Sequence, residues 1–348
     1  MSPLLAVALA VALLLAASWA HYAFWRWRLA APGREDERRW ARTADGWRLC
    51  LGRRRPRGPP RGVPVLLVHG LMMNRLALDW GEAGRSLAAA LAAEGFDCFA
   101  LDLRGHGASR PEPGAPRRWS LDDYLDRDLP AAMAEVAAAT GAPRLALVGH
   151  SQGALLALQA AVRAPEAVAA VVALAPPIRF TAHAARHLRL VPALAATGAA
   201  RLAARMVAPF VGLWHPRAAA LSIQPAEMEP PVFRRMMANA IEGLPPGVVA
   251  QFDAFVREDR CGSADGREDW RARLSDGRAP APFVAAPEDG IATPEIVREA
   301  CERWGGERAF VELPAGIGHT DMLLGRRAPA ALFPVVREWL ARRFPAGP

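Results

Sequence analysis

From about residue 40 to its end, the chain alternates between short apolar runs and longer stretches with helical periodicity. Residues 63–70 (VPVLLVHG) and 144–151 (RLALVGHS) form such runs, as expected for strands that are covered on both faces. Residues 80–95 (WGEAGRSLAAALAAEG) repeat their apolar positions with the spacing of a helix. This alternation predicts an α/β fold with a doubly wound, mostly parallel sheet.

The pattern predicts eight strands in that sheet. Residues 38–55 read as two strands joined by a turn at Asp45-Gly46, which predicts an antiparallel hairpin at the sheet edge. The other six strands are expected in the apolar runs at residues 63–70, 96–105, 144–151, 168–177, 281–289 and 308–316.

Composition excludes several classes of protein. Apolar residues make up 52% of the 348 residues and charged residues 22%, which is the balance of a globular chain and not of a disordered one. The net charge is +8, but the basic residues are scattered arginines without a basic helix, so we expect no nucleic-acid partner. The absence of lysine indicates a codon bias typical of a high-GC bacterium. The four cysteines are far apart, and no metal or cofactor motif occurs, so we expect no metal and no cofactor.

The N-terminus is predicted to meet a membrane. No charged residue occurs from Pro3 to Phe24, a length that can cross a bilayer core of roughly 30 Å as a helix. Residues 1–28 are therefore predicted to be a retained anchor, followed by a charged linker at 29–40. Arginines directly after the apolar run place the rest of the chain in the cytoplasm, at a bacterial inner membrane. A signal peptide cleaved after Ser18-Trp19-Ala20, and thus a secreted or periplasmic protein, is the alternative.

One interval interrupts the alternation of strands and helices. Residues 177–280 contain helix-like pieces and many prolines but no strong strand. Long connections in compact domains usually serve function, so this interval is predicted to be a helical cap or lid. The core domain is then expected in residues 41–176 and 281–345.

A serine stands where a strand turns into a helix. Gly149-His150-Ser151-Gln152-Gly153 lies between the run at 144–151 and the helical stretch that follows. A Gly-x-Ser-x-Gly sequence in that context predicts a nucleophile elbow, because strand and helix pack closely and the serine backbone is strained. The N-terminus of the helix also directs free N–H groups toward the serine, which suits a developing oxyanion. We therefore predict that Ser151 is a nucleophile.

With this turn, the chain resembles the α/β-hydrolase superfamily over about residues 40–345. The resemblance rests also on residues 65–71 (VLLVHGL), 102–109 (DLRGHGAS) and 316–323 (GIGHTDML). It implies a catalytic triad of serine, acid and histidine in that chain order.

The other two triad members are sought near the C-terminus. His319 is the only histidine after the last predicted strand, so it is the predicted base. The superfamily's usual turn, Gly-x-x-Asp-x-apolar, selects Asp289 as the acid when Ile291 takes the apolar position, and the neighbouring Glu288 is the alternative. The chain departs from that turn by carrying Ala286 where glycine is common.

The resemblance also implies an oxyanion hole. Its backbone N–H groups would come from Leu71, in the loop after the first parallel strand, and from Gln152. His69 and His150 lie beside these positions and are expected to shape turns by hydrogen bonds. Asp102, at the end of a strand, is expected to anchor a loop.

These residues predict a serine hydrolase that cleaves carboxylic esters through an acyl-enzyme. Met72, Met73 and the apolar pieces of the predicted cap favour small-molecule substrates with apolar or lipid-like acyl groups. Residues 117–136 also resemble relatives of polyhydroxyalkanoate synthases, which carry cysteine in the elbow. An acyltransferase or thioesterase with the same triad, a cofactor-free peroxidase and a non-catalytic binding relative are the alternatives. The sequence gives no indication of oligomeric state.

Overall fold

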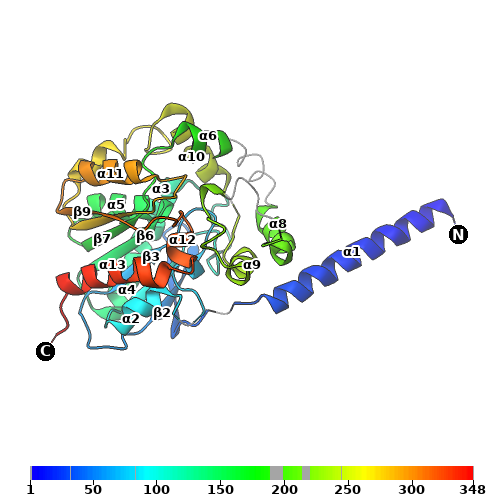
Figure 1. Cartoon of the computed structure of the whole chain (residues 1–348), viewed down its shortest axis with the longest axis horizontal. Coiled ribbons are helices and arrows are strands. Elements are labelled where there is room, and N and C mark those ends of the chain that lie inside the picture. Colours follow the sequence, from blue (N-terminus) through cyan, green and yellow to red (C-terminus); the bar gives the residue numbers. More distant parts are fainter. Residues whose placement is uncertain are drawn as a thin grey trace.

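One sheet with helices on both faces forms the body of the molecule, and one helix projects away from it (Figure 1). The computed structural model describes residues 2–31, 33–82, 84–188, 199–213, 220–243 and 245–347. Helices α5 and α11 lie against one side of the strands, and α2 and α13 pack together on the other (Figure 1). Their bounds are Leu87–Ala93 for α2, Gln152–Arg163 for α5, Pro294–Arg303 for α11 and Ala328–Arg343 for α13.

The sheet follows the predicted topology. Its order is β1-β2-β4-β3-β6-β7-β8-β9; β3, β4 and β6 to β9 pair in parallel, and β1 and β2 form an antiparallel hairpin at the edge. The strands are β1 (Glu37–Arg42), β2 (Trp47–Arg54), β3 (Val65–Val68), β4 (Cys98–Asp102), β6 (Leu145–His150), β7 (Val168–Leu174), β8 (Ala281–Ala285) and β9 (Arg308–Glu312). The doubly wound, mostly parallel sheet is thus confirmed.

Two details differ from the prediction. A ninth strand in the described residues, β5 (Arg110–Pro111), pairs with β2; two residues are too few to show any periodicity. The charged linker expected at 29–40 also ends earlier, because β1 begins at Glu37. Most residues of β1 are partly or fully exposed, so this edge strand can carry charged side chains. Its arginines led to the prediction of a charged linker.

Between β7 and β8 the described residues form several helices. They include α6 (Ala182–Leu188), α8 (Ala200–Val207), the short 3₁₀ helix η3 (Ala208–Phe210), α9 (Pro230–Asn239), α10 (Pro246–Glu258) and the 3₁₀ helix η5 (Ala272–Asp276). Parts of the predicted cap, residues 189–198, 214–219 and 244, lie outside the described residues. After α10 the chain returns to the core, where the Trp270 carbonyl accepts a hydrogen bond from Gln159 Nε2 of α5 at 2.9 Å.

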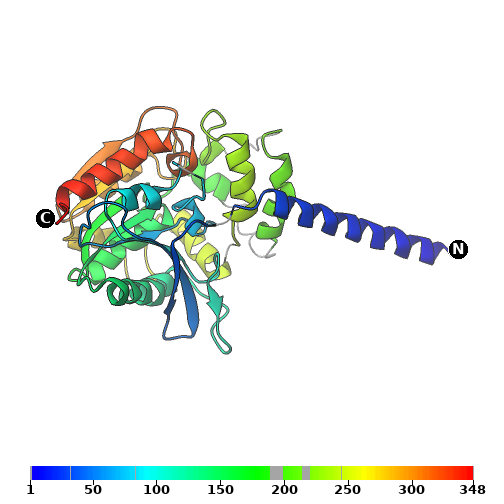
Figure 2. The same cartoon turned by 90° about the horizontal axis from the view of Figure 1, so that it is seen from below.

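The N-terminal helix α1 (Pro3–Arg28) is the projecting element (Figures 1 and 2). It is long and apolar enough to cross a membrane: an 18-residue window has a mean hydropathy of 2.2, and none of that window is buried. A signal sequence meets the same criterion, so α1 is compatible with both N-terminal interpretations. The core also contains α3 (Leu121–Asp123), α4 (Leu129–Thr140), α12 (Asp321–Leu324), the 3₁₀ helix η1 (Arg75–Ala77) and a π-helical turn at Tyr124–Asp128.

The turn from β6 into α5 brings three backbone segments into close contact. Ser151 has a φ of 55°, the strained left-handed conformation expected for the elbow. A Cβ added at Gly149 would lie 2.2 Å from the Gly153 carbonyl oxygen, and one at Gly153 would lie 2.1 Å from the Val68 carbonyl oxygen of β3. Both glycines are therefore required by packing, as the sequence predicts.

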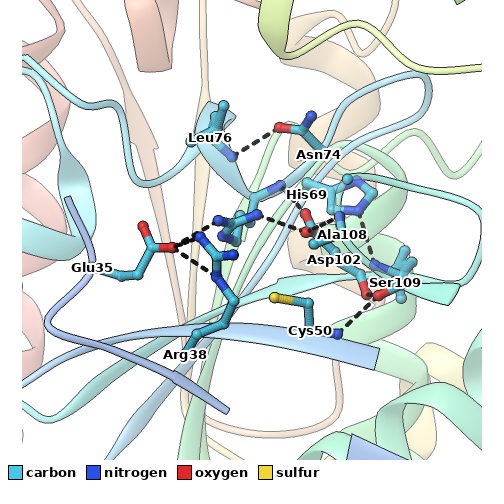
Figure 3. Close-up of polar contacts among 12 residues, drawn as sticks. Glu35, Arg38, Cys50, His69, Asn74, Leu76, Asp102, Ala108 and Ser109 are labelled. Atoms are coloured by element: carbon cyan, nitrogen blue, oxygen red, sulfur yellow. Dashed lines mark hydrogen bonds and ion pairs between the residues drawn. The ribbon is translucent and has the colours of Figure 1, made fainter. Parts of the chain in front are cut away.

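A network of hydrogen bonds around Asp102, at the end of β4, holds the adjacent loops in place (Figure 3). The buried Asp102 carboxylate accepts hydrogen bonds from the Arg75 backbone N–H, the Arg75 guanidinium and the Ala108 N–H, each at 2.8 Å. Ser109 Oγ donates to the Asp102 carbonyl and accepts from the Cys50 N–H. Asp102 thus anchors two loops, the loop-anchoring role expected from the sequence.

We expect Gly153→Ala to destabilise the fold by about 3 kcal/mol or more, because its methyl group would overlap backbone and not a movable side chain. Thermal unfolding of the full chain in detergent measures this change. Gly243→Ala is the matched control: apart from its chain neighbours, no heavy atom of the described residues lies within 4 Å of its added Cβ, so a change within about 0.5 kcal/mol is expected. Equal unfolding midpoints for the two variants would contradict the packing argument.

Candidate active site

The three residues predicted to act in chemistry follow three strands at the same edge of the sheet. Ser151 comes directly after β6, Asp289 follows β8, and His319 follows β9. His319 Nδ1 lies 2.6 Å from Asp289 Oδ2, and both side chains are buried. Ser151 and His319 line the same cavity, which has a volume of about 400 Å³.

The two candidate acids occupy different environments. Glu288 is exposed, whereas Asp289 is only 3% exposed and is the carboxylate that contacts His319. Asp289 Oδ1 accepts hydrogen bonds from the N–H groups of Ile291 and Ala292, each at 2.8 Å. Both carboxylate oxygens therefore have partners, which holds Oδ2 in place for the histidine despite the absence of the expected glycine at residue 286.

Two backbone segments lie beside Ser151, the loop after β3 and the first turn of α5. Gly70 lies against the serine, since a Cβ there would be 3.2 Å from Ser151 Cβ. The next residue, Leu71, lines the cavity, and its N–H has no acceptor within the described part of the chain. Gln152 is the first residue of α5, where backbone N–H groups precede the intrahelical hydrogen bonds. The two predicted oxyanion donors thus flank the serine.

His69 and His150 hold the turns on either side of Ser151. His150 Nε2 donates to the His319 carbonyl at 3.0 Å, which ties the elbow to the loop that carries His319. His69 Nε2 accepts from the Leu103 N–H, so its Nδ1 carries the proton donated to the Gly70 carbonyl. Burial lowers the pKa of His69 to about 4 and holds the pKa of His150 well below its usual value. Both are therefore neutral and shape turns, as expected.

The cavity beside Ser151 is predominantly apolar. Its walls come from the loop after β3 and from residues of the insertion between β7 and β8. The apolar side chains that line it include Leu71, Met72, Met73, Phe180, Ile223, Phe233, Met236, Met237, Ile241, Val249, Phe252, Val256 and Ile291.

Comparison with known proteins assigns the family. A model of the alpha/beta hydrolase fold family matches residues 63–325. The chain belongs to the alpha/beta hydrolase fold family.

Curated relatives of this hydrolase-fold chain include lipases. It is 38% identical over 138 residues to Lipase member K of Homo sapiens, a match that covers 36% of this chain and 34% of that protein. It is 33% identical over 135 residues to the lysosomal acid lipase/cholesteryl ester hydrolase of Homo sapiens, covering 36% and 34%. The matches thus span about a third of the length of these relatives.

Solved structures show the same fold at low sequence identity. An esterase from Thermogutta terrifontis superposes with a TM-score of 0.60 at 19% identity, covering 88% of this chain and 99% of that one. Naproxen esterase from Bacillus subtilis superposes with a TM-score of 0.56 at 18% identity, covering 94% and 96%. At these identities the superpositions establish the fold alone.

A short segment of the insertion, Leu221 and Ser222, contacts the loops of Asp289 and His319. No sequence pattern predicts these contacts. The Leu221 carbonyl accepts from the Gly290 N–H at 3.0 Å, next to Asp289, and the Ser222 carbonyl accepts from the Thr320 N–H at 2.8 Å, next to His319. One short segment therefore holds the loops of both residues. These are backbone contacts between distant parts of the chain, so no side-chain motif reports them.

Glu242 is a second residue that the sequence does not reveal. Its buried carboxylate accepts from Asn74 Nδ2 at 2.9 Å and the Gly107 N–H at 3.1 Å, and pairs with the Arg201 guanidinium of α8 at 2.5 Å. Its own N–H donates to the Met72 carbonyl at 2.7 Å. Glu242 therefore connects the insertion to the loop that carries Leu71.

Asp321 is a third such residue, in the first turn of α12. Its Oδ2 accepts from the Gln224 N–H at 2.7 Å and the Gly318 N–H at 3.1 Å, so it also connects the insertion to the loop of His319. Burial raises the pKa of the Asp321 carboxyl to about 7. The sequence suggests only a charge at a helix N-terminus, because burial at this position depends on the insertion.

Asp321 should make the folded state lose stability as pH rises. An aspartate in the unfolded chain titrates near pH 4, so the folded state binds this proton more tightly, and its contribution is lost between about pH 4 and 7 by up to about 1.4 kcal/mol per pH unit. Asp321→Asn removes this loss. Urea unfolding at pH 5 and pH 8 should show the variant gaining stability relative to the native chain at the higher pH.

The exposed Asp276 provides the control for this experiment. Asp276→Asn should track the native chain at both pH values. An Asp321→Asn variant whose stability changes with pH as the native chain's does would disprove the assignment.

Proposed function

We propose that this chain is a serine hydrolase that cleaves carboxylic esters with apolar acyl groups. The observation that carries the proposal is the His319–Asp289 contact of 2.6 Å at a cavity that also exposes Ser151 on a strained turn. The lipase and esterase names of the relatives and structural neighbours support ester chemistry.

The proposed reaction assigns one step to each group. The Nδ1–H of His319 donates to Asp289, so Nε2 is the nitrogen that takes the proton from Ser151 Oγ as it attacks the ester carbonyl. The N–H groups of Leu71 and Gln152 stabilise the tetrahedral oxyanion. His319 then protonates the leaving alcohol, and it activates a water molecule that releases the acid from the acyl-enzyme.

The insertion between β7 and β8 is proposed to act as the cap that selects substrates. The cavity is lined by Phe233 and Met236 of α9 and by Val249 and Phe252 of α10, together with the loop after β3. These walls offer an acyl chain apolar contacts and few polar partners. Free energy from burying methylene groups would then favour longer acyl chains.

We further propose that α1 is a retained anchor in a bacterial inner membrane, with the hydrolase domain in the cytoplasm. Arg26 and Arg28 occupy the last turn of α1, and Trp25 and Trp27 lie beside them. Arginines on the domain side of the span support a cytoplasmic domain, and tryptophans support an interfacial position for this turn.

Ser151→Ala should abolish labelling by a fluorophosphonate probe and lower kcat for p-nitrophenyl esters by a factor on the order of 10⁶, because the attacking oxygen is removed. The exposed Ser275→Ala is the matched control and should label as the native chain does. Labelling that survives in Ser151→Ala, or native chain that never labels, would refute the proposal and favour a non-catalytic binding relative.

The cap hypothesis predicts a dependence on acyl length. Each added methylene group should raise kcat/KM by about fourfold until the cavity is filled, from about 0.8 kcal/mol per buried CH₂. Val256→Phe reduces the cavity volume at another lining residue of α10, so the optimum should shift to shorter chains while acetate esters are cleaved as before. A series of p-nitrophenyl esters measures both trends, and a native profile that is flat or favours acetate would exclude an apolar acyl pocket.

A further inference from the structure

The C-terminal part of helix α1 packs against the insertion between β7 and β8. The His21 ring stacks on Phe210 of η3, with centroids 5.7 Å apart and planes at 9°. His21 Nε2 lies 3.5 Å from the Met206 carbonyl of α8. Figures 1 and 2 both show α8 beside the base of α1. The insertion and the apolar helix thus form one contact surface.

The position of this contact along α1 matches the edge of a bilayer. Residues 3–20 precede the contact, and at 1.5 Å per residue they form a rod of about 27 Å. That length is close to the roughly 30 Å hydrocarbon core of a membrane. When α1 spans a bilayer, His21 and the η3 residue stacked on it therefore lie at the boundary between acyl chains and headgroups.

The insertion presents exposed apolar side chains on and next to α8 and η3, the elements that contact α1. Leu202 is 54% exposed, Val207 48%, Phe210 53% and Leu213 78%. We call these four residues the α8–η3 surface. Clusters of large exposed apolar side chains mark sites that contact a membrane or another molecule. Its position against a helix that can cross a membrane identifies the bilayer as the occupant, and the exposed Arg26 and Arg28 of that helix complement anionic headgroups.

The same region is part of the wall of the cavity. Met237 of α9 lines the cavity and also packs on the cluster formed by Leu29, Ala208 and Ala238, where α1 ends. One side chain therefore connects the chain segment at the membrane boundary to the space beside Ser151. An ester with an apolar chain in the adjoining leaflet would be close to the pocket that binds it.

We propose that the α8–η3 surface rests in the leaflet that α1 enters, and that the site takes its apolar ester substrates from that leaflet. The part of this inference that concerns substrates rests on the proposed ester hydrolase activity. The part that concerns the surface rests on the packing of α1 and on exposed apolar area.

The surface is tested by fluorescence quenching of the full chain in nanodiscs that contain anionic lipid. A bimane label is placed at Leu213→Cys or, as control, at Glu302→Cys on α11; the four native cysteines are buried, which favours selective labelling. Brominated lipid should quench the label at residue 213 severalfold more than the label at 302, and aqueous iodide should do the reverse. Equal iodide quenching at both positions would overturn the proposal.

The source of substrate is tested with Leu202→Ser combined with Leu213→Ser. Hydrolysis of a long-chain ester embedded in the nanodisc should fall severalfold, whereas a soluble short-chain ester should be cleaved at the native rate. Equal loss on both esters, or loss on neither, would overturn delivery from the leaflet. If native chain cleaves no ester at all, the proposed function fails, and the quenching result still decides the membrane contact.

Discussion

The close approach of three backbone segments at Gly149, Ser151 and Gly153 is the constraint on which the other features of the site depend. A side chain at either glycine would overlap a carbonyl oxygen, so β6, α5 and β3 meet at this distance only with glycine present. This contact positions the N-terminus of α5 and the loop after β3 beside the serine. The strained φ of Ser151 is maintained because the surrounding strand and helix are buried and closely packed.

The site also depends on contacts made by the insertion. Leu221 and Ser222 hold the loops of Asp289 and His319 through backbone hydrogen bonds, and Glu242 connects α8 to the loop that carries Leu71. The segment proposed to select substrates thus also positions the groups proposed to carry out catalysis. Changes in this segment are therefore expected to alter the geometry of the site as well as the volume of the cavity.

The sequence predicts the sheet well because its central strands are buried on both faces and read as continuous apolar runs. It predicts Ser151 from a local turn with strict steric demands, and a short motif favours Asp289 over Glu288 as the acid. The structure places Asp289 beside His319 although the motif is incomplete at Ala286, because Ile291 and Ala292 supply the N–H groups that orient the carboxylate. What the sequence does not predict involves contacts between distant residues, as at Asp321, or elements too short or too exposed to show a pattern, as at β5 and β1.

The central claim is that Ser151 forms an acyl-enzyme with the aid of His319 and Asp289. It is tested most directly by mixing the full chain with an ester that turns over slowly, quenching the reaction in acid and mapping the tryptic peptides by mass spectrometry. The account predicts that the acyl group is found on the peptide of residues 145–163, at Ser151, and that it disappears at the rate of turnover. An acyl group on any other residue would contradict the account. Turnover without an adduct, under conditions in which hydrolysis of the acyl-enzyme limits the rate, would also contradict it.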